Sequence, residues 1–214
     1  MPDYKGVIFD LDGTLLDSMY VWEKIDIDFL SRRQIVVPED YMQSIAHLGA
    51  YDTAVYTINR FKLTDTPEQL ITEWVEMAIE EYKSVPLKPG VEKYIMFLKE
   101  NNIKISIATA TEPEIIKAGM EGKSIESSID FVSTVADAGK GKEYPDIYLN
   151  CAKHMNLSPE ECIVFEDLPM ALKTAISANF KAIRVYDKYA CIDENEFSDI
   201  KCIYNFEEML EAAD

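Results

Sequence analysis

The chain has few of the side chains that build zinc centres or disulfide frameworks. Its 214 residues include only two histidines and four cysteines, and no two cysteines form a C-x-x-C pair. The histidines are His47 and His154, and the cysteines are Cys151, Cys162, Cys191 and Cys202. We therefore expect no structural zinc site. Four cysteines in a chain of this length are not typical of a disulfide scaffold. We therefore expect these cysteines to be buried thiols in a reducing compartment.

Basic residues are also scarce. There are 21 lysines and arginines against 39 aspartates and glutamates, which gives a formal net charge of -18. Nucleic acid polymers and anionic membranes both bind basic surfaces, so we expect neither as a partner. A small anionic substrate stays open, because a local cation or metal ion can outweigh the overall charge.

The sequence has no run of about 18 apolar residues, which a membrane-spanning helix would need. Residues 1–6 pass directly into an apolar strand and resemble neither a signal peptide nor a transit peptide. We therefore expect a cytoplasmic protein without a membrane partner. We also expect a monomer.

Hydrophobic residues make up 48% of the chain, which is enough for a sizeable core. Outside one helical block, short apolar runs alternate with helical patterns. The runs predict strands at residues 5–10, 104–108, 131–134, 162–165, 182–185 and 202–204. The patterns predict helices at residues 90–101, 113–120, 145–155, 168–178 and 206–212. This alternation predicts an α/β fold, a doubly wound parallel sheet with helices on both faces.

The helical block follows the first expected strand. Asp17 or Ser18 is expected to cap its first helix, because apolar residues follow at helical spacing. Three further helices are expected at residues 39–47, 51–61 and 67–83. A cluster of breakers, Pro86, Pro89 and Gly90, then marks a linker. We expect an α/β core formed by residues 1–16 and 87–214, with residues 17–86 inserted as an α-helical cap.

Polar side chains follow the expected strands where each one ends. They are Asp10 and Asp12, Thr109 with Ala110 behind it, Lys140 and Lys142, and Glu166 and Asp167. Ligands of open parallel sheets bind at the carboxyl ends of the strands, so we expect these groups on one rim. Carboxylates are hard oxygen ligands suited to Mg²⁺, and one of them can serve as a nucleophile. Lysine, threonine and backbone amides would hold a phosphoryl group.

Asp10-Leu11-Asp12-Gly13-Thr14 resembles the first motif of the haloacid dehalogenase superfamily. Thr109, Lys142 before Pro145-Asp146-Ile147-Tyr148, and Glu166-Asp167 resemble its second, third and fourth motifs, in the same order. The resemblance implies a hydrolase of the phosphatase or phosphomutase branch, with a helical cap where the block of helices lies. The aspartate at position 12 favours that branch, because dehalogenase and phosphonatase members lack one there.

The resemblance also implies a role for each matching residue. Asp10 would attack phosphorus, and Asp12 would be the general acid and base. Thr109, the backbone of Ala110, and Lys142 would bind the phosphoryl group. Mg²⁺ would be held by Asp10, the backbone carbonyl of Asp12, and Asp167, with Glu166 as a further ligand. The family more often has Lys-Pro-x-Pro where this chain has Lys142-Glu143-Tyr144-Pro145, so Lys140 is the alternative lysine.

These expectations describe a magnesium-dependent phosphatase acting on a small phosphomonoester, such as a sugar phosphate, a phosphoglycolate-like acid or a nucleotide. His47, Tyr51 and Trp22 in the helical block are candidates for substrate recognition. One alternative is a sugar-phosphate mutase of the beta-phosphoglucomutase type. Mutases hold a second phosphate, and the loop that follows His47 offers no lysine or arginine for it. The other alternative is a non-catalytic module that binds a phosphometabolite.

Overall fold

The computed structural model describes residues 3–45, 48–190, 197 and 199–211. The chain divides into two compact units. One, the α/β unit, is formed by Met1–Ser18 and Val85–Asp214, and the other, the helical unit, by Met19–Ser84. The boundaries expected from the sequence, at 16/17 and 86/87, lie close to these. No helix among the described residues has the length and apolar character that crossing a membrane requires.

A single parallel sheet organises the α/β unit, with its strands in the order β3-β2-β1-β4-β5-β6. The strands are β1 (Gly6–Phe9), β2 (Lys104–Thr109), β3 (Phe131–Thr134), β4 (Cys162–Glu166), β5 (Lys181–Val185) and β6 (Cys202–Ile203). β1 is fully buried between β2 and β4, which explains its uninterrupted apolar sequence. The fold class predicted from the sequence is confirmed.

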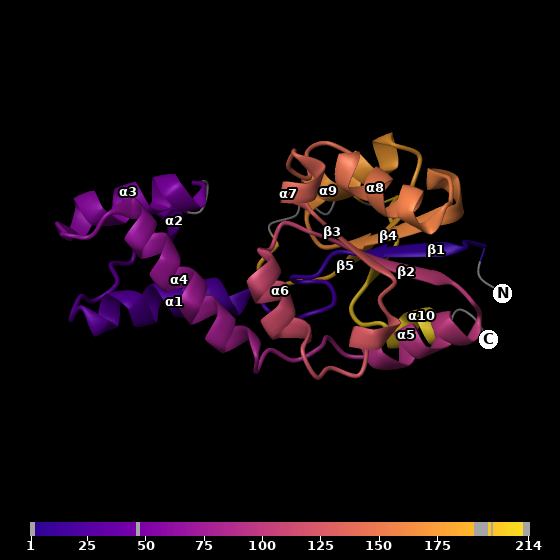
Figure 1. Ribbon diagram of the computed structural model, residues 1–214, viewed down its shortest axis with the longest axis horizontal. Coiled ribbons are helices and arrows are strands. Elements are labelled where there is room, and N and C mark those ends of the chain that lie inside the picture. The colour runs from indigo at the N-terminus through magenta and orange to yellow at the C-terminus, as the bar shows by residue number, and fades with distance from the viewer. Residues whose placement is uncertain (1–2, 46–47, 191–196, 198, 212–214) are drawn as a thin grey trace. The chain divides into compact units, whose positions relative to one another are not determined.

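The helices of this unit cover both faces of the sheet. They are α5 (Val91–Glu100), α6 (Pro113–Met120), α7 (Val135–Ala138), α8 (Asp146–Met155), α9 (Pro169–Ser177) and α10 (Glu207–Glu211), with short 3₁₀ turns at Glu126–Ser128 and Pro159–Glu161. α8 and α9 lie on one face and α5 and α10 on the other (Figure 1). α7 was not predicted from the sequence.

Side chains alternate between these two faces along each central strand. Ile8, Ala108 and Val164 pack into the core beneath α8. Phe9 and Phe165 stack on the opposite face, with ring centroids 5.1 Å apart, against aromatic side chains of α5 and the segment before α10. This two-residue period also decides which way the polar side chains at the strand ends point.

The helical unit consists of α1 (Tyr20–Arg32), α2 (Tyr41–Ile45), α3 (Ala50–Phe61) and α4 (Pro67–Tyr82). α4 begins as its sequence predicts, because Thr66 and Gln69 form a capping box and Pro67 follows the cap. The prediction that Asp17 or Ser18 caps α1 was wrong. Met19 occupies the cap position and makes no side-chain capping bond, while the Ser18 hydroxyl is bonded elsewhere.

Candidate active site

The strand order reverses at β1, since the chain adds β2 and β3 on one side of it and β4, β5 and β6 on the other. In open parallel sheets such a reversal opens a crevice beyond the carboxyl ends of the strands. Asp10 follows β1 directly, and Glu166 is the last residue of the neighbouring β4. The Asp10 amide donates to the Phe165 carbonyl at 2.9 Å, which continues the pairing to the strand ends.

The turn after β1 is built by its leucines. The Leu11 carbonyl accepts hydrogen bonds from the amides of Leu15 and Leu16 at 2.9 and 2.8 Å, and all three leucine side chains are fully buried. Gly13 has a φ of 74°, a backbone conformation that favours glycine. Apolar burial therefore anchors this loop, and Asp10 and Asp12 are held at the rim.

Lys142 is the cation of the cluster. Asp10 and Glu166 share the sheet face of Ile8 and Val164, towards the loop that leads into α8. From that loop, Lys142 Nζ donates to Asp10 Oδ1 and to Glu166 Oε2, the latter at 2.9 Å. All three side chains are buried. The alternative lysine, Lys140, lies on the exposed side of the same loop and is paired with Asp146 at 3.2 Å.

Asp167 is buried without a hydrogen-bond donor. It is 1% exposed, and neither carboxylate oxygen has a donor among the described residues. Asp10, Glu166 and Asp167 each place an oxygen within 4.8 Å of the others, the one such acidic group found in the described part of the chain. Three buried carboxylates therefore face one buried ammonium. Burying charge of one sign is costly, so the cluster requires bound protons or a cation.

The excess of negative charge in the cluster changes the pKa values of its side chains. Burial, with the charge of Glu166, raises the pKa of Asp10 well above its usual range, although Lys142 opposes the shift. The same two causes raise the pKa of Asp167 to about 8. Burial alone would lower the pKa of Lys142, but the charges of Asp10 and Glu166 raise it instead. Without a metal ion, the cluster keeps its ammonium charged and favours protonation of Asp10 and Asp167.

Asp12 lies beside the cluster and is only partly buried. Its Oδ1 accepts a hydrogen bond from Ser18 Oγ at 2.6 Å, and its Oδ2 accepts one from Thr111 Oγ1. Thr109, buried at the end of β2, accepts the Thr111 amide on its Oγ1 at 3.1 Å, and Ala110 between them is exposed. The side-chain contacts of Ser18 and Thr111 were not predicted. The only sequence signal was a polar residue just beyond each motif.

The three residues suggested for substrate recognition all belong to the helical unit. Trp22 in α1 is 42% exposed, and Tyr51 in α3 is 55% exposed. His47 lies outside the described residues. The proposed roles of these residues stay predictions.

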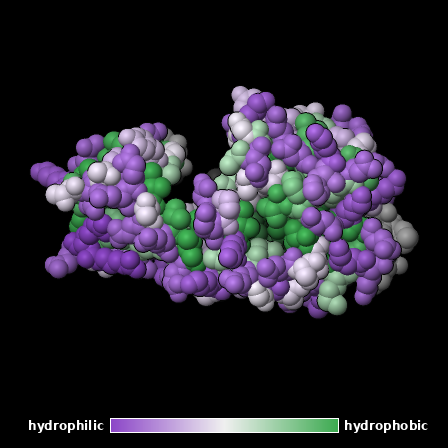
Figure 2. Space-filling view, viewed as in Figure 1, coloured by the Kyte–Doolittle hydropathy of each residue, from purple (hydrophilic) through white to green (hydrophobic). Residues whose placement is uncertain are grey.

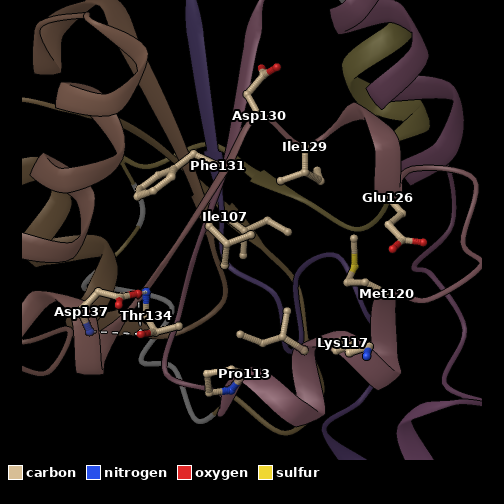
Figure 3. Close-up of a pocket in the computed structure, with 12 residues that line it drawn as sticks. Ile107, Pro113, Lys117, Met120, Glu126, Ile129, Asp130, Phe131, Thr134 and Asp137 are labelled. Atoms are coloured by element: carbon tan, nitrogen blue, oxygen red, sulfur yellow. Dashed lines mark hydrogen bonds between the residues drawn. The ribbon is translucent and has the colours of Figure 1, made fainter.

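A hollow lies elsewhere in the α/β unit, between α6 and the edge strand β3. Figure 2 shows hydrophobic atoms gathered on this face of the unit. The groove has a volume of about 610 Å³, and its lining includes Ile107, Met120, Ile129 and Phe131 (Figure 3). Asp10, Glu166 and Asp167 are not part of this lining. The carboxylate cluster is the better candidate for the reactive site on chemical grounds, because it brings together the carboxylates and the ammonium.

Known proteins resemble this chain over most of its length. Beta-phosphoglucomutase of Bacillus subtilis is 28% identical over 195 residues, covering 85% of this chain and 83% of the relative. Hexitol phosphatase A of Escherichia coli is 28% identical over 184 residues, covering 85% and 82%. The crystal structure of CbbY from Rhodobacter sphaeroides in complex with phosphate shares the fold, with a TM-score of 0.78, 19% identity and 96% coverage of both chains.

A family profile also matches. The profile described as haloacid dehalogenase-like hydrolase covers residues 7–185, which include all of the first strand but Gly6, the helical unit and all four motifs. The resemblance recognised from those motifs is thereby confirmed. The chain belongs to the haloacid dehalogenase-like hydrolase family.

Proposed function

We propose that this protein is a magnesium-dependent phosphatase that hydrolyses a small phosphomonoester through an aspartyl-phosphate on Asp10. The observation that carries the proposal is Asp167, a buried carboxylate with no donor, beside Asp10 and Glu166. Such a group is stable only with a bound proton or a cation. Membership of a hydrolase family with phosphatase relatives supports the same conclusion.

The cluster fits a magnesium ion in both charge and ligand type. Three carboxylates and one ammonium carry a formal excess of two negative charges, which a divalent cation would neutralise. Oxygen ligands suit Mg²⁺, which is bound through a few carboxylates together with substrate phosphate. Asp10, Asp167 and the backbone carbonyl of Asp12 would hold the ion, with Glu166 as a further ligand. The bound ion would supply charge neutralisation for the phosphoryl group.

The side chains supply the two chemical steps. Because Lys142 engages Asp10 Oδ1, we assign Oδ2 as the atom that attacks phosphorus. The bond from phosphorus to the ester oxygen breaks, and Asp12 gives that oxygen a proton, which releases the alcohol. Asp12 then takes a proton from water, whose oxygen attacks phosphorus and releases phosphate and free Asp10. Thr109, the Ala110 backbone and Lys142 hold the phosphoryl oxygens throughout.

A panel of substrates tests the proposal directly. Phosphate release should be measured from hexitol phosphates, sugar phosphates, phosphoglycolate and nucleotides, with Mg²⁺ and with a chelator. The hexitol phosphates come first, because a relative is named for them. We expect release that depends on Mg²⁺, and we expect Asp10→Asn to abolish it while the circular dichroism spectrum is unchanged. Glu143→Gln is the matched control, because Glu143 is an exposed acid next to Lys142.

A phosphomutase is the second candidate, because one relative is a beta-phosphoglucomutase. It would use the same Asp10 chemistry but return the phosphoryl group to another hydroxyl of the sugar. Conversion of a sugar 1-phosphate into a 6-phosphate with little free phosphate would favour it. A ligand that raises the melting temperature but is never converted would instead favour a non-catalytic binding module.

A further inference from the structure

One buried hydroxyl group contacts the carboxylate cluster from outside the motifs. It belongs to Tyr148, in the first turn of α8. The side chain is fully buried and belongs to the core cluster between α8 and the sheet. Its ring meets the Phe180 ring edge to face, with centroids 6.1 Å apart. A phenylalanine would preserve all of this packing, so the hydroxyl needs a separate explanation.

The hydroxyl donates to Glu166 Oε2 at 3.1 Å. The same oxygen accepts the Lys142 ammonium at 2.9 Å, and Lys142 also donates to Asp10. A chain of hydrogen bonds therefore runs from Tyr148 through Glu166 and Lys142 to Asp10. The phenol is the donor in this contact, because a carboxylate oxygen accepts.

The two neighbouring acids differ in their bonding because of this contact. Glu166 Oε2 has two strong donors, and the Leu168 amide lies 3.4 Å from Oε1. Asp167 has no donor among the described residues. The Tyr148 hydroxyl contacts Glu166, the last residue of β4, and makes no bond to Asp167, which follows the strand. The hydroxyl thus fixes the orientation of one acid and leaves its neighbour open to a cation.

We propose that Tyr148 is a positioning residue for the divalent-cation site, acting through Glu166. The inference rests on the proposed function, since it assumes that the cluster binds a divalent cation. The hydroxyl holds the Glu166 carboxylate in one orientation, which keeps Lys142 between Glu166 and Asp10. Because these side chains are already ordered before the cation binds, less conformational entropy is lost on binding. Side chains that orient metal ligands in this way contribute about 10- to 100-fold to metal affinity or activity.

Mn²⁺ binding to the full chain, without substrate, tests the proposal. Free Mn²⁺ is counted by electron paramagnetic resonance as the protein is titrated. We expect Tyr148→Phe to weaken binding about tenfold, the lower end of that range. Tyr94→Phe is the matched control, because Tyr94 is also fully buried in the α/β unit and its hydroxyl is bonded to Tyr4 at 2.6 Å. It should bind Mn²⁺ as the unmodified protein does.

A double-mutant cycle with Glu166→Gln separates positioning from general structural damage. If Tyr148 acts through Glu166, Tyr148→Phe should have no further effect on Mn²⁺ binding in the Glu166→Gln background. Equal Mn²⁺ affinity of Tyr148→Phe and the unmodified protein would overturn the proposal, and so would effects that simply add in the double variant. Absence of Mn²⁺ binding by the unmodified protein would overturn the proposed metal site itself, a result distinct from both.

Discussion

Lys142 provides the most direct test of the charge balance in the cluster. Replacing it with methionine keeps most of the side-chain volume but removes the one ammonium that, among the described residues, contacts Asp10 and Glu166. Three buried carboxylates then remain without their cation. Removing one partner of a buried ion pair typically costs 3–5 kcal/mol, because the other charge is left uncompensated.

The expected shift in melting temperature follows from that cost. For a chain of this size, 1 kcal/mol corresponds to about 2–4 °C, so Lys142→Met should lower the melting temperature by about 6–20 °C. The loss should be larger at pH 8 than at pH 5, because protonation of the carboxylates at low pH removes the charge that lacks a partner. Added Mg²⁺ should restore part of the lost melting temperature.

Differential scanning calorimetry in chelator and in Mg²⁺ measures both effects. Lys140→Met is the control, since Lys140 is exposed and its pairing with Asp146 is worth at most about 1 kcal/mol. Equal melting temperatures for the two variants, in chelator at pH 8, would refute the reasoning. That result would mean that the carboxylates of the cluster are neutral or solvated without Lys142.

Three further predictions concern other groups. Mg²⁺ at a hundred times its dissociation constant should raise the free energy of unfolding by about 2.7 kcal/mol, and Asp167→Asn should remove that gain in a thermal melt. Thr111→Val deletes a hydrogen bond to the Asp12 carboxylate, and such a bond contributes about 1.5–3 kcal/mol. The kcat of this variant should therefore fall about 10- to 100-fold, whereas Thr111→Ser, which keeps the hydroxyl, should restore kcat. In the helical unit, burial raises the pKa of Asp26 to about 6, partly opposed by a hydrogen bond from Tyr41. The protonated Asp26 carboxyl therefore contributes to stability below pH 4, and this contribution is lost as pH rises through 6. Asp26→Asn should accordingly raise the free energy of unfolding of the unit at pH 7 by at most about 3 kcal/mol, measured by urea unfolding. A lower free energy of unfolding in the variant would contradict this prediction.

The strands and the rim of polar residues could be predicted because their signals are local. A strand buried on both faces is a short apolar run, and β1 and β4 are both of this kind. The polar residue at the end of each run marks the carboxyl edge of the sheet. α7 was missed because a helix of four residues is too short to show a helical period, although its Thr134–Asp137 capping box is present.

The contacts between motifs could not be predicted, because they join residues that are distant in sequence. Asp12 and Thr111 are 99 positions apart, and nothing near either one indicates the other. Ser18 shows the opposite problem. A serine before a helical pattern predicts a cap, but a buried hydroxyl 2.6 Å from a carboxylate binds that stronger acceptor instead. The local rule fails where a tertiary contact offers the same hydroxyl a better partner.

The alternation of side chains along β4 links the fold to the chemistry of the site. Glu166 continues the face of Val164, beneath α8, and therefore meets Lys142 and Tyr148. Asp167 follows the end of β4 and keeps an oxygen within 4.8 Å of those of Asp10 and Glu166, but it has no donor among the described residues. Two adjacent acids of similar chemistry thus acquire different surroundings, because one is the last residue of the strand and the other begins the segment that follows it. A shift of one residue in the β4 register would turn Glu166 away from the face beneath α8, so the pairing of β4 with β1 also decides which carboxylate accepts those donors.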